Sequence, residues 1–74
     1  MDRSATTFRI GDDVRVIVLA SEWMDSRGTI VDIVERPLEG GTGRKVQECA
    51  VLFGTERRWF MADHLAFINR GSAH

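Results

Sequence analysis

The pattern of apolar and polar positions predicts β-strands rather than helices. Residues 14–19 read VRVIVL, in which β-branched side chains recur with a period of two. A second apolar stretch, GTIVDIVERPL at 28–38, departs from strict alternation because Ile30 and Ile33 are three residues apart. We therefore expect a β-bulge or a strong bend in this strand, which would bring both isoleucines to one face. Pro37 should end the strand or confine its last residues to a sheet edge.

The second half of the chain predicts three further strands with short connections. KVQECAVLF at 45–53 and RRWFM at 57–61 both read as strands. The Gly-Thr pair at 54–55 is short enough to join them as antiparallel neighbours. ADHL at 62–65 is too short for an α-helix and fits one 3₁₀ turn. LAFI at 65–68 then predicts a short fifth strand.

No segment shows a helical period over three turns, so the predicted fold is all-β: a five-stranded barrel with one 3₁₀ turn before the last strand. The expected core comprises Val14, Val16, Ile30, Ile33, Val51, Phe53, Leu65 and some of Trp59, Phe60, Phe67 and Ile68. Since adjacent strand residues face opposite sides, one of Trp59 and Phe60 should be exposed.

Three stretches of the chain carry a resemblance to a known family of small barrels. They are GDDVRV at 11–16, RGTIVDI at 27–33 and RRWFMADHLAFI at 57–68. Together they resemble the SH3-like barrel of the KOW and electron-transport accessory type, as found in the variable subunit of ferredoxin–thioredoxin reductase and the nitrile hydratase β-subunit. The resemblance covers residues 8–69. It implies a domain that holds or covers a catalytic partner and carries no chemistry itself.

Length and composition fit one ordinary globular domain. The chain has 74 residues, of which 43% are hydrophobic and 28% charged. We expect a folded domain at 8–69 with flexible tails at 1–7 and 70–74. No apolar run approaches the roughly 20 residues of a membrane helix, and the N-terminal residues lack the apolar core of a signal peptide. The sequence therefore predicts a cytoplasmic protein without a membrane segment.

The residues that could carry chemistry are few. A metal site needs three or four ligands, and Cys49 and His64 are the only strong candidates inside the predicted domain. Cys49 lies among apolar strand residues and is expected to be an inert, buried thiol. Asp12 and Asp13 fall in a turn, where Asp is favoured for local backbone hydrogen bonds. We predict no catalytic, cofactor or metal site, and hence no enzyme.

The sequence leaves two hypotheses for a binding surface. The leading hypothesis is a non-catalytic accessory domain, a monomer or weak dimer, that binds another protein. Its predicted contact residues are Trp23, Met24, Arg58 and Trp59. A related possibility is an aromatic cage for a methylated cation, drawn from Trp23, Phe53, Trp59 and Phe60.

The alternative is a nucleic-acid-binding module of KOW or Tudor type. Its predicted patch is Arg44, Lys45, Arg57 and Arg58, which neighbouring strands would bring together beside an aromatic ring. Two features argue against it. The net charge is -1, whereas phosphate backbones favour clustered positive charge. Glu48 and Glu56 on the same hairpin would also pair with these bases.

Overall fold

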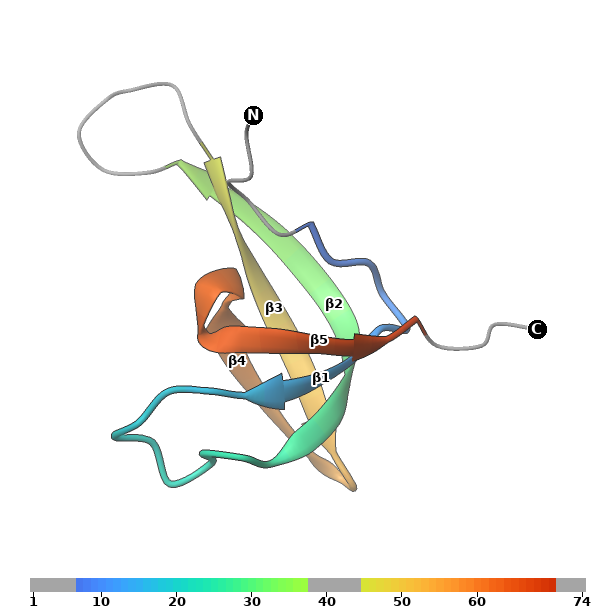
Figure 1. Cartoon of the computed structure of the whole chain (residues 1–74). Helices are drawn as coiled ribbons and strands as arrows, with labels where there is room; N and C mark the ends of the chain where they lie inside the picture. Colours follow the sequence, from blue (N-terminus) through green and yellow to red (C-terminus); the bar gives the residue numbers. More distant parts are fainter. Residues whose placement is uncertain (1–6, 38–44, 71–74) are drawn as a thin grey trace.

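The computed structural model describes residues 7–37 and 45–70, which form one antiparallel sheet of five strands (Figure 1). The elements are β1 (Asp13–Val16), β2 (Arg27–Pro37), β3 (Lys45–Phe53), β4 (Glu56–Met61), the 3₁₀ turn η1 (Ala62–His64) and β5 (Leu65–Asn69). The all-β class, the five strands and the 3₁₀ turn before the last strand are confirmed. None of the described residues forms a helix long and apolar enough to cross a membrane.

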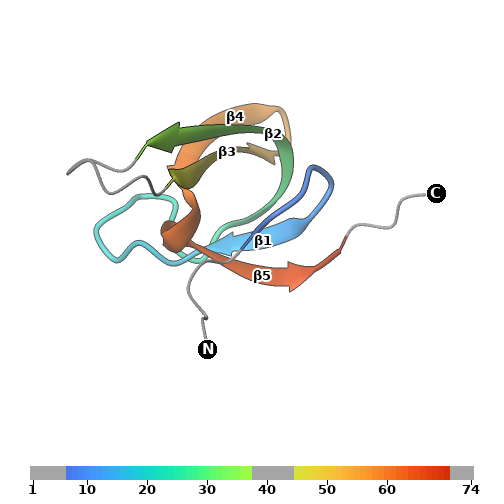
Figure 2. The ribbon, with the colours of Figure 1, turned by 90° about the horizontal axis from the view of Figure 1, so that it is seen from above.

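The sheet curls but does not close. Its strand order is β4-β3-β2-β1-β5, so β4 and β5 are the two edges of the described sheet. Seen from above, β1 and β5 lie across from β3 and β4, and β2 passes from one half to the other (Figure 2). The predicted closure into a barrel is not found. The chain leaves β4 through η1 and then pairs β5 with β1 alone, so no ladder joins β5 to β4 in the described residues.

The expected irregularity in β2 is confirmed. It allows this one strand to pair with β1 in one half of the sheet and with β3 in the other. Its first residues pair with β1 and its remainder pairs with β3. The register with β3 shifts between Ile30 and Asp32, so one residue is skipped as in a β-bulge. Ile30 is fully buried, and Ile33 packs against the same core. The bulge therefore brings both isoleucines to one face, as their spacing predicts.

Gly28 permits the close approach of β2 to β3. A Cβ atom at this position would lie 2.6 Å from the carbonyl oxygen of Leu52 and 2.6 Å from Cγ1 of Val51. Such distances are shorter than any ordinary van der Waals contact. Only glycine fits here without movement of the neighbouring backbone.

The core lies on the concave side of the curled sheet. Its buried members are Phe8, Val14, Val16, Ile30, Cys49, Val51 and Leu65, with Val18, Trp23, Ile33, Phe53, Phe60 and Ala62 packed against them. The predicted core is thus largely confirmed. Trp59, Phe67 and Ile68, which were candidates for it, are exposed instead. Phe60 packs inward, so Trp59 is the exposed member of that pair.

The segment before β1 completes the core in a way the sequence does not predict. The Phe8 backbone N–H donates to Gln47 Oε1 at 2.8 Å, and Gln47 Nε2 donates to the Phe8 carbonyl at 3.1 Å. Asp12 is fully buried. Its Oδ2 accepts from the Arg9 backbone N–H at 2.9 Å, and its Oδ1 lies 3.6 Å from Arg70 Nε. These contacts attach both ends of the described chain to the sheet.

Candidate functional site

Trp23 is presented by the connection between β1 and β2. The Ser21 Oγ atom accepts a hydrogen bond from the Trp23 backbone N–H at 2.9 Å, and the Trp23 carbonyl accepts one from Ser26 N–H at 2.8 Å. Met24 donates its backbone N–H to the Ser21 carbonyl at 3.1 Å. Asp25 adopts a positive φ of 69°, which Asp tolerates better than most residues. These bonds hold Trp23 and Met24 in a compact turn.

The Trp23 ring stacks on a ring from the β3 strand. Its centroid lies 4.5 Å from that of Phe53, with an interplanar angle of 20°. Phe53 in turn meets Phe60 edge-on, at 6.0 Å and 85°. Both are favoured aromatic geometries. Because these three rings pack on one another, they form part of the core and not an open cage.

Arg58 covers the Trp23 ring from β4. Its Cζ atom lies 5.8 Å from the ring centroid, within the range of a cation–π contact. The guanidinium also pairs with the carboxylate of Glu56, and both side chains are 49% exposed. The structure therefore brings Arg58 and Trp23 together, with Met24 beside Trp23 in the same turn. We call Trp23, Met24 and Arg58 the Trp23 surface.

Trp59, the fourth predicted contact residue, lies on the other face of the sheet. Arg58 pairs across the ladder with Val51, whose side chain is in the core, and adjacent strand residues face opposite sides. Trp59 is 39% exposed and has the Arg57 Cζ atom 5.6 Å from its ring centroid. The four predicted residues thus divide between two faces.

The predicted basic patch is not assembled by the described residues. Lys45 pairs with Pro37 at the start of β3, whereas Arg57 pairs with Leu52 near its end. At about 3.3 Å per residue, these positions are roughly 23 Å apart. Arg57 and Arg58 also face opposite sides of β4. Arg44 lies outside the described residues.

The groups that could carry chemistry do not converge. Cys49 is buried, and the loss of solvent, together with the nearby carboxylates of Asp12 and Glu48, raises the pKa of its thiol to about 11. Such a thiol is protonated at neutral pH and is a poor nucleophile. His64 is exposed beside Asp63, at 3.9 Å. Within 7–37 and 45–70, no group of three His, Cys, Asp or Glu residues is placed to hold a metal ion.

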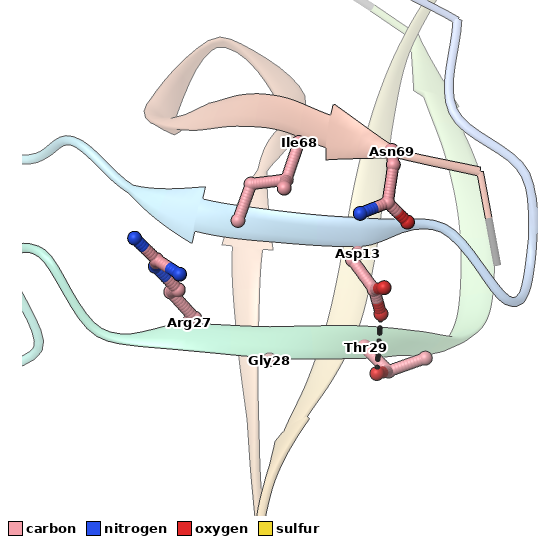
Figure 3. Close-up of a pocket in the computed structure, with 6 residues that line it drawn as sticks. All are labelled: Asp13, Arg27, Gly28, Thr29, Ile68 and Asn69. Carbon is pink, nitrogen blue, oxygen red and sulfur yellow. Dashed lines mark hydrogen bonds between the residues drawn. The ribbon is translucent and has the colours of Figure 1, made fainter.

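A second surface feature lies where β1, β2 and β5 run side by side (Figure 3). It is a hollow of about 290 Å³ lined by Asp13, Arg27, Gly28, Thr29, Ile68 and Asn69. The Thr29 hydroxyl donates to Asp13 Oδ1 at 2.9 Å, which fixes the carboxylate at one end. Sequence reasoning missed this site because its residues are distant along the chain and are joined only by strand register.

Comparison with known proteins finds no match for this chain: no protein-family model, no curated protein sequence and no solved structure matches it. The function is therefore inferred from the residues and their arrangement.

Proposed function

We propose that this chain is a small non-catalytic domain that binds another protein through the Trp23 surface. The observation that carries the proposal is the contact between Arg58 and the Trp23 ring, which joins the β1–β2 connection to β4. Trp, Met and Arg are enriched at protein interfaces, and Trp and Arg are frequent among the residues that dominate binding energy. The non-catalytic part of the proposal remains a prediction from the sequence.

The chemistry of the Trp23 surface suggests what the partner presents. Arg58 offers a planar guanidinium, which suits a carboxylate. Glu56 now occupies part of it, but this pair is exposed and therefore contributes little to stability. A partner carboxylate can replace Glu56 at small cost. We expect the partner segment to carry an acidic residue for Arg58 next to an apolar one for Trp23 and Met24.

An SH3-like arrangement is part of the same proposal. The strand order β4-β3-β2-β1-β5, the η1 turn between β4 and β5, and the β2 strand shared by both halves support it. In such an arrangement the edges of β4 and β5, which would pair in a closed barrel, are not joined by a ladder. The family resemblance then favours an accessory role beside a larger protein.

A nucleic-acid partner is supported less well. Lys45 and Arg57 lie near opposite ends of β3, and Arg58 is paired with Glu56. The positive charges are therefore dispersed. Strong nucleic-acid binding through counterion release instead requires them to line one surface. A single-stranded oligonucleotide that gave strongly salt-dependent amide shifts at 57–58 would favour this alternative.

The protein-binding proposal is tested by capture with two matched variants. Arg58→Glu and Arg57→Glu change the charge equally at adjacent positions of β4, but on opposite faces. We expect Arg58→Glu to reduce the recovery of a specific partner from a lysate of the source cells, and Arg57→Glu to leave it unchanged. Equal recovery by wild type and both variants would show that the Trp23 surface is not the contact site.

A further inference from the structure

The outer face of β1 and β2 carries a direct pair of like charges. Arg15 and Arg27 are cross-strand partners, and an arrangement of this kind is unfavourable unless an acid neutralises it. Arg15 has such an acid, because its Nη1 atom lies 3.1 Å from Asp25 Oδ1. Arg27 makes no ion pair with any other residue of 7–37 or 45–70. It borders the hollow of Figure 3 without an ion-pair partner among these residues.

The opposite end of the same hollow is acidic. Asp13 pairs across the ladder with Thr29, two residues further along β2 than Arg27. The Thr29 hydroxyl holds one oxygen of its carboxylate. The hollow therefore has a cationic end at Arg27 and an anionic end at Asp13, which are about 7 Å apart along the strands.

An apolar side chain stands beside these charges. Ile68 lines the hollow from β5 and is 37% exposed. Figure 3 shows it over the ribbon of β1, between the Arg27 and Asn69 side chains. This face therefore carries both a protruding apolar side chain, Ile68, and a hollow that can receive such a side chain.

We propose that this face pairs with the same face of a second copy of the chain about a two-fold axis. A two-fold interface requires a surface that complements itself, in which residue i meets residue j and j meets i. Asp13 of each copy then faces Arg27 of the other, and Ile68 of each copy packs against the other hollow. A net charge of -1 does not oppose such self-association.

The pattern of charge favours a second copy over a purely anionic ligand. A carboxylate or phosphate bound at Arg27 would also meet the Asp13 carboxylate, which repels it. A second copy compensates both ends at once. We expect a weak dimer that forms with rising concentration. The Trp23 surface is not used in this contact.

The test is sedimentation equilibrium of the full chain over a wide concentration range, with charge-swap variants. Arg27→Glu places Glu against Asp13 of the second copy, and Asp13→Lys places Lys against Arg27. We expect each single variant to weaken dimerisation roughly tenfold or more. An equimolar mixture of the two should recover wild-type association, because every contact in the mixed dimer again joins opposite charges.

Two further variants serve as controls. Ile68→Asp should also abolish association, and it decides the question if Asp13→Lys fails to give a folded amide spectrum. Lys45→Glu, at the end of β3 far from this face, should associate like the wild type. A wild-type chain that stays monomeric at every concentration would overturn the proposal. So would a dimer that neither Arg27→Glu nor Ile68→Asp weakens.

Discussion

The guanidinium of Arg58 lies over the ring of Trp23, with Cζ 5.8 Å from the ring centroid, whereas the next residue, Trp59, sits on the opposite face with Arg57. The described residues thus make two tryptophan–arginine contacts, one on each face of β4. Only the first joins two segments far apart in the sequence. It is also continuous with the core through the stacked ring of Phe53.

The two tryptophans should therefore contribute unequally to stability. Trp23→Ala removes a ring that packs against the core, and we expect it to lower the free energy of unfolding by about 2 to 3 kcal/mol. Trp59→Ala removes a more exposed ring and should cost about 1 kcal/mol. Urea unfolding followed by circular dichroism measures both values. Equal losses for the two variants would contradict the different packing of the two rings.

Substitution by alanine should destabilise the protein at both Gly28 and Gly54, but for different physical reasons. At Gly28 the added Cβ collides with backbone and side chain of β3, and we expect a loss of about 3 kcal/mol. At Gly54 no atom lies within 4 Å of the added Cβ, but φ is 66°, so the cost is only that of a left-handed conformation, about 1 kcal/mol. Thermal or urea unfolding of both variants checks the order. A Gly28→Ala protein as stable as Gly54→Ala would show that β2 and β3 are not this close.

The buried carboxylate of Asp12 should matter chiefly as a hydrogen-bond acceptor. Asp12→Ala leaves the Arg9 N–H without its partner, and we expect a loss of about 1 to 3 kcal/mol. Asp12→Asn keeps an oxygen for that bond and should cost less, although it removes the charge facing Arg70. Unfolding curves of the two variants separate these contributions. If Asn were as damaging as Ala, the ion pair with Arg70 would be the more important interaction.

The Cys49 thiol predicts a specific dependence of stability on pH. Burial and the nearby carboxylates of Asp12 and Glu48 raise its pKa from 9.0 to about 11 in the folded protein. The folded state therefore binds the thiol proton more tightly than the unfolded state does. This contribution to stability is fully present below pH 9 and is lost as the pH rises from about 9 to about 11.

Urea unfolding of wild type and Cys49→Ala over this pH range measures the effect. The stability difference between the two proteins should decrease by about 2 to 3 kcal/mol as the pH rises. The alanine variant is the reference because it lacks the titrating thiol and retains every other group. A difference that stays constant up to pH 11 would mean that the thiol is not shielded from solvent.

Local features of the fold were predictable from the sequence. The spacing of Ile30 and Ile33 indicated the bulge, and the Gly54-Thr55 pair indicated the tight turn between β3 and β4. The first strand is shorter than predicted. β1 ends at Val16, and the chain then turns, with the Ser21 N–H donating to the Val18 carbonyl at 3.2 Å. An apolar run alone does not report where such a turn begins.

Long-range features were not predictable in the same way. The burial of Asp12 depends on Arg9 and Arg70 meeting at one place, and the separation of the β4 and β5 edges depends on which strand β5 joins. The hollow at Arg27 depends on the register of three strands. For the Trp23 surface, alternation shows that Arg58 and Trp59 face apart, but which of them meets Trp23 is set by the register of β3 with β4.

Site-specific photo-crosslinking tests the central claim most directly. A photoreactive amino acid replaces Met24, on the Trp23 surface, or Arg57, on the opposite face of β4, and each protein is irradiated in a lysate of the source cells. We predict that position 24 yields a discrete crosslinked species, that Arg58→Glu in the same chain abolishes it, and that position 57 does not yield it. Crosslinks from position 57 alone, or a product from position 24 that Arg58→Glu leaves unchanged, would contradict binding through Trp23 and Arg58.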